Sequence, residues 1–273
     1  MLEVCLKENI LLLDHVIVTA LGLEKKESSL AYAVQKVRGE ELNRVKEVNM
    51  ITALAGKAAG VQVSKNSSGM GGSAKVSIRG VRSVAGDNQP LYVIDGVPML
   101  NSTSEQAYSA IGGTANAGNR DGGDGISNLN PEDVESISIL KGAPAAALYG
   151  SQAANGVILI TTKKGNTVGR RDIHFSTGLT FEKAFSLPEM QNSYGVSDVT
   201  DSWGEKENLT VYDNLGDFFR TGLTSITSVS VNSGNDKLQT YFSYANTTGR
   251  GILNENKLSK HNINLRETAV LFN

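Results

Sequence analysis

Cysteine, proline and long apolar runs are all scarce in this sequence of 273 residues. Cys5 is the one cysteine, so no disulfide can form within the chain, and a small buried hydrophobe explains it best. The most apolar early stretch, residues 10–20, is interrupted by Asp14 and His15 and falls short of the roughly 18 apolar residues of a membrane-spanning helix. The sequence therefore predicts no transmembrane helix. It also predicts no signal peptide in this stretch, which lacks a basic start and a small-residue cleavage site.

An excess of charge of either sign is also missing, because 26 basic residues balance 28 acidic ones. This balance gives no electrostatic reason to expect a nucleic-acid partner. The histidines His15, His174 and His261 are scattered without the spacing of metal ligands, and motifs of the HExxH, CxxC and GxSxG types do not occur. We therefore predict that the chain is not an enzyme and that it uses neither a cofactor nor a metal.

Glycine is abundant, with 29 residues, and short apolar runs alternate with polar turns. This texture is typical of β structure with many turns. Helices are predicted at 49–59 and 143–149, and Asp95-Gly96 predicts a tight turn. Apolar or alternating runs predict strands at 14–20, 61–63, 74–79, 91–94, 137–140 and 156–162. Residues 40–165 are thus expected to form a mixed α+β globule.

Residues 130–133, Asn-Pro-Glu-Asp, predict a helix start, because Asn caps, Pro suits the first position and acids favour the positive end of the helix dipole. Capping explains Glu132 and Asp133 better than acid–base chemistry does. Residues 101–128 are rich in Ser, Gly, Asn and Ala, so they predict a long loop, either functional or disordered. Residues 21–34 predict a polar linker with weak helical character.

Longer alternating runs follow residue 170, each about ten residues long, as in tilted barrel strands. They lie at 172–182, 225–233, 237–247 and 262–271. Ser233 to Asp236 predict a hairpin between the second and third runs. Residues 183–224 are polar with scattered aromatics and predict a surface loop, in which Trp203 suits either an extracellular position or an interfacial aromatic belt.

Three segments of the first half resemble the plug domain of TonB-dependent outer-membrane receptors. They are SIRGVRS (77–83), PLYVIDGVP (90–98) and NPEDVESISILKGAPAAALYGSQAANGVILITTKKG (130–165). The ALYG and GVILITTKKG parts of the longest segment are similar to the SusC/RagA branch of that family.

Two segments nearer the start extend the resemblance to residues 2–165. LLDHVIVTALG (12–22) is similar to the junction that carries the TonB-contacting box. LEVCLKE (2–8) resembles the last strand of the carboxypeptidase-regulatory-like domain that precedes the plug in this branch. Residues 170–273 match the family mainly in pattern.

The resemblance implies a fold class and a domain order. The fold is an α+β plug domain, a mixed sheet with short helices, followed by antiparallel β-strands of an incomplete transmembrane β-barrel. Residues 1–13 would end the regulatory-like domain, 14–38 form the TonB box and linker, 39–166 the plug, and 167–273 the start of the barrel. The family's barrels have 22 strands, so the chain is expected to be one part of a larger protein, with its signal peptide upstream.

The resemblance also implies TonB-dependent import of a large nutrient, a glycan or an oligopeptide, across the outer membrane of a Gram-negative bacterium. The implied partners are TonB with the inner-membrane energising complex, a SusD-like surface lipoprotein, outer-membrane lipid and the substrate. TonB would contact seven consecutive residues: Asp14, His15, Val16, Ile17, Val18, Thr19 and Ala20. Their β-branched centre favours extended backbone, which can add to the edge of a partner's sheet. An ordinary core strand is the alternative.

Two further groups are expected near the barrel wall and the substrate. Arg79, Gly80 and Arg82 would face the barrel wall, with a solvated turn as the alternative. The loop at 101–128 would lie on the substrate side and offer hydrogen-bonding side chains, with Tyr108, Asn116 and Asn119 as the candidates. The alternative is a flexible loop that contacts no ligand. The competing function is a soluble ligand-binding or signalling module with a plug-like fold and no transport, against which the later alternating strands argue.

Overall fold

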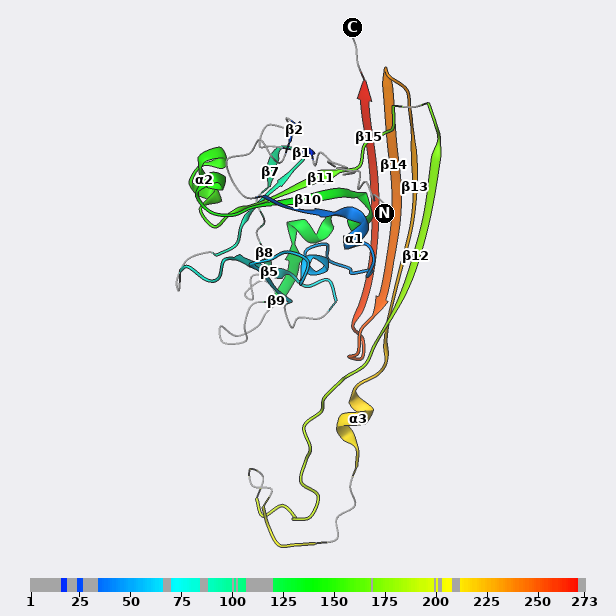
Figure 1. The fold of residues 1–273 in the computed structure, drawn as a ribbon. Helices are drawn as coiled ribbons and strands as arrows, with labels where there is room; N and C mark the ends of the chain where they lie inside the picture. Colours follow the sequence, from blue (N-terminus) through cyan, green and yellow to red (C-terminus); the bar gives the residue numbers. More distant parts are fainter. Residues whose placement is uncertain are drawn as a thin grey trace, which may run out of the picture. The chain divides into compact units, whose positions relative to one another are not determined.

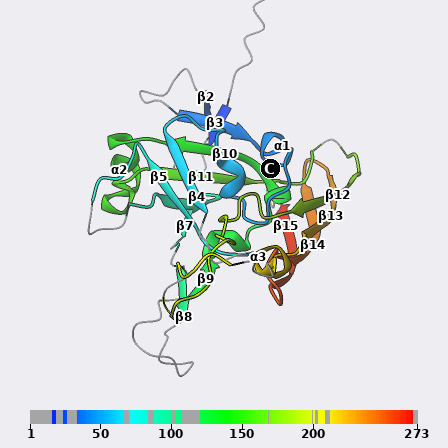
Figure 2. The ribbon, with the colours of Figure 1, turned by 90° about the horizontal axis from the view of Figure 1, so that it is seen from below.

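The computed structural model describes most of the chain (Figures 1 and 2). The described residues are 16–18, 24–26, 34–65, 70–83, 88–99, 101, 103–106, 120–167, 169–198, 200, 203–207 and 212–269. They divide into two compact units, the first made of 1–66 and 73–163 and the second of 67–72 and 164–273. The predicted strand at 2–8 lies outside the described residues.

A five-stranded sheet forms the centre of the first unit, with the strand order β3-β10-β11-β6-β7. The strands are β3 (Val34–Arg38), β10 (Val134–Leu140), β11 (Val157–Thr162), β6 (Leu91–Ile94) and β7 (Val97–Met99). β11 is parallel to β6 and the remaining neighbours are antiparallel, so the sheet is mixed as predicted. β3 occupies residues that the sequence assigned to the linker.

Alternate residues of this sheet enter two apolar clusters, one on each face. Ile137, Ile139 and Ile158 belong to the larger cluster, whereas Leu140 and Leu159 belong to the smaller one. A strand buried on both faces needs apolar residues at successive positions. This explains the uninterrupted apolar run of β11, which the sequence identified correctly.

Short elements cover the two faces. The β-hairpin of β4 (Val61–Lys65) and β5 (Ala74–Ile78) contributes to the larger cluster. Helix α2 (Ala143–Tyr149) and the 3-10 turn η6 (Ser151–Ala153) contribute to the smaller one. The predicted turn at Asp95-Gly96 is confirmed, with φ angles of 47° and 88° between β6 and β7.

The α-helix predicted at 49–59 is wrong. A single 3-10 turn, η2 (Thr52–Leu54), stands in its place, because Ala55 leaves the helical conformation and Gly56 has a φ of 73°. Ala55 is exposed, whereas Ala53 is buried. A short helix, α1 (Gly39–Leu42), was not predicted.

The Asn-Pro-Glu-Asp motif starts a 3-10 turn, η5 (Pro131–Asp133), rather than a longer helix. The Asn130 side chain accepts a hydrogen bond from the Glu132 amide at 3.2 Å, so the predicted cap is confirmed. β10 begins directly afterwards, at Val134, because the β-branched apolar pattern takes over there.

The loop predicted at 101–128 contains ordered elements. β8 (Thr103–Gln106) pairs antiparallel with β9 (Arg120–Asp124), and the 3-10 turn η4 (Gly125–Asn128) follows. These strands are polar and glycine-rich, so backbone pairing rather than an apolar pattern defines them. The helical character predicted for 21–34 is also wrong where described, because Glu24–Lys26 forms strand β2.

The second unit is a sheet of four long antiparallel strands in the order β12-β13-β14-β15. Their bounds are Asp172–Glu182, Gly222–Gly234, Leu238–Arg250 and Lys257–Ala269. A tight turn at Asn235 joins β13 to β14, as predicted. A long connection that contains helix α3 (Asn214–Phe218) joins β12 to β13 (Figure 1). Among the described residues, no helix combines the length and the apolar character needed to cross a membrane.

One face of this sheet carries exposed apolar side chains in rows that run across the strands; we call them the apolar rows. The register aligns Ile173, Val231, Phe242 and Leu265 in one row, and Phe175, Val229, Tyr244 and Ile263 in the next. The third row is polar, and its members are Thr177, Thr227, Asn246 and His261. Strands that alternate between an apolar and a polar face are typical of membrane barrels.

We predict that Gly156→Ala destabilises the first unit more than Gly60→Ala does. Both glycines have positive φ, 103° and 68°, which costs other residues about 1–3 kcal/mol. A Cβ at Gly156 would also lie 2.9 Å from Ile78 Cδ1 and 3.0 Å from the Leu140 carbonyl oxygen, whereas at Gly60 nothing lies within 4 Å. Overpacking adds roughly 1–3 kcal/mol at the first site alone. Urea unfolding compares the variants, and equal losses would contradict the prediction.

Candidate functional site

The predicted TonB-contacting segment contains a short strand. Val16–Val18 forms β1 and pairs antiparallel with β2, so that Ile17 lies opposite Lys25. The other predicted contacts, Asp14, His15, Thr19 and Ala20, lie outside the described residues. β1 and β2 form a sheet of two strands, which leaves β1 one further edge in the described part of the chain.

β3 is the next strand along the chain and lies at the edge of the five-stranded sheet. Among the described strands it pairs with β10 alone, from Val34 opposite Leu140 to Arg38 opposite Ser136. An edge strand has hydrogen-bonded neighbours on one side only. β3 is therefore one of the two edge strands of this sheet, and it is the one nearer to β1 along the chain.

Gln35 of β3 connects three parts of the first unit through its side-chain amide. Its Oε1 accepts hydrogen bonds from the Ala59 amide at 3.0 Å and from Lys141 Nζ at 2.8 Å. Its Nε2 donates to the Lys57 carbonyl at 3.4 Å. We call this arrangement the Gln35 clasp. It fixes the edge strand to the turn before β4 and to the end of β10.

Lysine side chains complete the clasp. Lys141 Nζ also donates to the Ala59 carbonyl, and Lys57 Nζ donates to the carbonyls of Glu41 and Leu42. Burial lowers the pKa of Lys141, and the charge of Arg79 lowers it further. These ammonium groups are satisfied by backbone carbonyls, which position a lysine without neutralising its charge.

A second set of polar contacts involves residues 43–46, which follow helix α1 along the chain. Asn43 Nδ2 donates to the Pro131 carbonyl at 3.2 Å, and Lys46 forms an ion pair with Glu132. Burial lowers the pKa of Lys46, with a smaller contribution from the charge of Lys163. Pro131 and Glu132 of the Asn-Pro-Glu-Asp motif thus join residues 43–46 to the turn that precedes β10.

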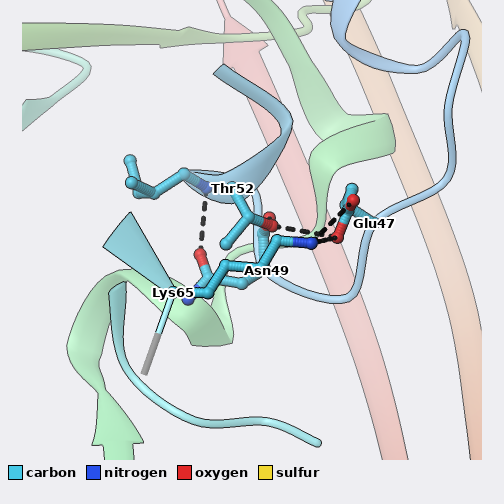
Figure 3. A network of polar contacts seen from close by, with 5 residues as sticks. Glu47, Asn49, Thr52 and Lys65 are labelled. Carbon is cyan, nitrogen blue, oxygen red and sulfur yellow. Dashed lines mark hydrogen bonds and ion pairs between the residues drawn. The ribbon is translucent and has the colours of Figure 1, made fainter. Parts of the chain in front are cut away.

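Figure 3 shows a third network, around the turn η2. The Glu47 carboxylate accepts from Lys65 Nζ at 3.0 Å and from Thr52 Oγ1 at 3.1 Å. Asn49 Oδ1 accepts from the Ile51 amide at 2.9 Å, which caps the turn (Figure 3). These hydrogen bonds hold residues 47–52 to β4, and Ile51 within this segment is fully buried.

The residues predicted to face the barrel wall follow β5 and are exposed in the described structure. The Arg79 amide donates to the Gly60 carbonyl at 2.8 Å, and its side chain lies beside Gly142. Arg82 Nη1 donates to the Ala154 carbonyl at 2.9 Å. Gly80 has a φ of 85°, which suits glycine. The predicted substrate-side residues Tyr108, Asn116 and Asn119 lie outside the described residues.

Sequence reasoning missed the Gln35 clasp. Gln35 is 24 positions from Ala59 and 106 from Lys141, so no local spacing connects them. One signal was available: Lys141-Gly142 follows the apolar run of β10 directly, and a lysine beside a sheet often seeks carbonyl partners.

We predict that Gln35→Ala speeds hydrogen exchange of the β3 amides. Loss of the three hydrogen bonds lowers the free energy of opening by about 1–3 kcal/mol, which is roughly 5- to 150-fold in rate. Exchange measured by mass spectrometry on a peptide that spans β3 tests this. Gln62→Ala, at an exposed position of β4, is the matched control and should leave the rate unchanged. Equal rates in both variants would show that the clasp contributes nothing.

We predict a pH dependence that originates at Lys163. Burial lowers its pKa below the ordinary 10.5, although the carboxylates of Asp133, Glu40 and Glu135 act in the opposite direction. The unfolded chain therefore binds more protons between the lowered pKa and 10.5, so the free energy of unfolding rises with pH in that window. Denaturation followed by circular dichroism should show a shallower rise for Lys163→Met. An unchanged slope would refute this origin.

Comparisons with known proteins agree with this geometry. Residues 26–157 match the family described as the TonB-dependent Receptor Plug Domain. The chain is 33% identical over 266 residues to TonB-dependent receptor SusC of Bacteroides thetaiotaomicron, covering 92% of this chain and 24% of SusC. It is 35% identical over 180 residues to TonB-dependent receptor P26 of Formosa agariphila, covering 65% of this chain and 16% of that receptor.

A solved structure of the RagAB peptide importer in its "open-open" state is similar with a TM-score of 0.65 and 25% identity, over 92% of this chain and 30% of that one. The chain thus spans about a quarter or less of the curated relatives named above. The predicted fold class is confirmed: an α+β plug with a mixed sheet, followed by antiparallel strands of the barrel type in an open sheet. This chain belongs to the TonB-dependent receptors of the SusC/RagA type.

Proposed function

We propose that this chain supplies the coupling segment and the gating plug of a TonB-dependent importer in the outer membrane of a Gram-negative bacterium. The order of elements along the chain carries the proposal. A short β-branched strand, β1, precedes β3, the edge strand of the plug sheet, and barrel-type strands follow the plug. A pull on β1 is therefore delivered first to β3, which has one pairing partner among the described strands.

TonB binds by adding a strand to the segment Asp14–Ala20 in this proposal. Main-chain pairing suits such a role, because it resists a pull along the strand and tolerates changes of side chain. β1 already adopts the extended conformation, with Val16 opposite Lys26 and Val18 opposite Glu24. TonB either joins the further edge of β1 or replaces β2.

In this proposal the pull is transmitted from β1 into the plug through the polar contacts described above. β3 is held by its pairing with β10 and by the Gln35 clasp, and the segment beyond it by Asn43 and by the Lys46–Glu132 pair. Beyond these ties the chain enters the apolar core at Met50 and Ile51, both fully buried. Polar ties break and re-form at lower cost than a packed core, so the plug opens at its edge and keeps its centre.

The substrate is a large nutrient, a glycan or an oligopeptide, admitted together with a SusD-like surface lipoprotein. The similarity to SusC and to the RagAB peptide importer supports this class of cargo. The predicted contacts keep their proposed roles: Arg79, Gly80 and Arg82 toward the barrel wall, and the loop at 101–128 toward the substrate. The chain performs no catalysis in this scheme.

The test is calorimetric binding of the 273-residue chain, in detergent micelles, to the periplasmic C-terminal domain of TonB. Val16→Pro and Val18→Pro are each expected to weaken binding at least tenfold, because proline removes a backbone donor. Val16→Thr and Val18→Thr are the matched controls, since they keep both the donor and the β-branched side chain. Undetectable binding by the folded wild-type chain would overturn the proposal, as would tight binding by the proline variants.

A further inference from the structure

The connection between β12 and β13 contains a small hairpin-like fold, which we call the aromatic hairpin (residues 191–198 and 203–207). Its two arms are joined by backbone hydrogen bonds: the Gly195 amide donates to the Glu205 carbonyl at 2.9 Å, and the Gly204 amide to the Gly195 carbonyl at 2.8 Å. The Glu207 amide donates to the Ser193 carbonyl at 3.2 Å. The arms therefore hold each other in a defined position.

Two aromatic side chains lie together on this hairpin. The ring centroids of Tyr194 and Trp203 are 5.5 Å apart, and the ring planes are inclined by 47°. Each residue directly precedes a glycine at the crossing of the arms, Gly195 or Gly204. A Cβ on Gly204 would lie 2.9 Å from the Gly195 carbonyl oxygen, so the close approach of the two arms beside the rings requires glycine there.

The rings are unusually accessible for large aromatic groups in contact. Trp203 is 67% exposed and Tyr194 is 38% exposed. Burial thus does not explain their pairing, because neither ring enters either apolar cluster of the described residues. Gln191 fixes the backbone beneath them: its Oε1 accepts from the Tyr194 amide at 2.9 Å and its Nε2 donates to the Tyr194 carbonyl at 2.8 Å. Such a preorganised surface loses little entropy on binding.

The surroundings of the rings indicate the chemistry of a ligand. Exposed polar groups flank them, and the described arms carry three acids, Asp198, Glu205 and Glu207, against one lysine, Lys206. A net negative surface disfavours an anionic ligand. The faces of aromatic rings are electron-rich and attract partly positive C–H groups, whereas carboxylates and amides accept or donate hydrogen bonds at the rim. A neutral pyranose ring presents both features, an apolar C–H face and a rim of hydroxyls.

We propose that Tyr194 and Trp203 form a binding platform for neutral sugar rings on the β12–β13 connection. The inference rests on the proposed import function, which it narrows from a glycan or peptide to a neutral glycan. A place in a membrane-interfacial belt fits less well, because the connection runs well beyond the ends of the four strands (Figure 1). The platform captures a glycan chain outside the barrel wall by stacking its rings.

Trp203 is the one tryptophan of the chain, so its fluorescence reports directly on the platform. The 273-residue chain in detergent micelles is titrated with four neutral hexasaccharides: cellohexaose, maltohexaose, xylohexaose and mannohexaose. At least one is expected to give a saturable change in emission. Tyr194→Ala should weaken that response at least tenfold, whereas Tyr194→Phe, which keeps the ring, should retain it.

Phe185→Ala is the matched control, because Phe185 is a fully exposed aromatic of the same connection, and it should leave binding unchanged. No response to any of the four sugars overturns the inference, as does an equal response in Tyr194→Ala. A response to hexa-alanine alone assigns the platform to peptides instead. Binding of the TonB domain is measured on the same preparation. If no sugar binds but the TonB domain does, only the inference of a sugar platform is overturned. If the wild-type chain does not bind the TonB domain, the proposed function is overturned.

Discussion

Strand β10 is hydrogen-bonded along both of its edges, to β3 on one side and to β11 on the other, and the plug is organised around it. Its apolar side chains reach both clusters: Val134, Ile137 and Ile139 belong to the larger one and Leu140 to the smaller one. Its two neighbours differ in kind. β11 is buried and has a second partner in β6, whereas β3 has β10 alone among the described strands. β10 is therefore flanked by one strand that is paired along both edges and one that is paired along a single edge among the described strands.

Polar contacts add to the pairing of β3 with β10. The Gln35 side chain is bonded to the Lys57 carbonyl, the Ala59 amide and Lys141 Nζ, and Lys46 pairs with the buried Glu132 carboxylate. Polar contacts are specific in geometry, and water can replace them when they break. Apolar contacts at Ile137 or Ile158 have no such replacement, because exposure to water removes their stabilisation. The β3 edge thus differs from the centre of the plug in having polar contacts in addition to apolar packing.

Much of this fold was accessible from the sequence, and the exceptions have physical reasons. The apolar runs of β5, β6, β10 and β11 predicted strands correctly, since these strands are buried. β8 and β9 were missed because they are polar, and pairing rather than burial defines them. The turn η2 was taken for a longer helix because its apolar spacing is helical, although Gly56 breaks the backbone.

The second unit and the functional site also contain features that the sequence did not predict. The last strand begins at Lys257, five residues before the predicted run at 262–271, because Leu258 is the one apolar residue among its first six. Its pairing with β14 defines it there instead. The order of coupling segment, plug and barrel strands was expected from motifs, whereas the Gln35 clasp depends on contacts between residues 24 and 106 positions apart in the sequence.

On the face that carries the apolar rows, exposed apolar residues extend further along the first strand of the second unit than along the last. On β12 exposed apolar residues continue to Phe181, whereas on β15 they end at Ile263, three rows earlier in the register. Rows of paired residues run perpendicular to the strands, whereas the boundary of a lipid layer is parallel to the membrane plane. An oblique apolar boundary therefore corresponds to strands inclined to the membrane normal, by roughly 35–45° in membrane barrels. Inclination and strand number together set the radius of a closed barrel. The apolar boundary on these four strands thus reports on the first of these two quantities, the inclination.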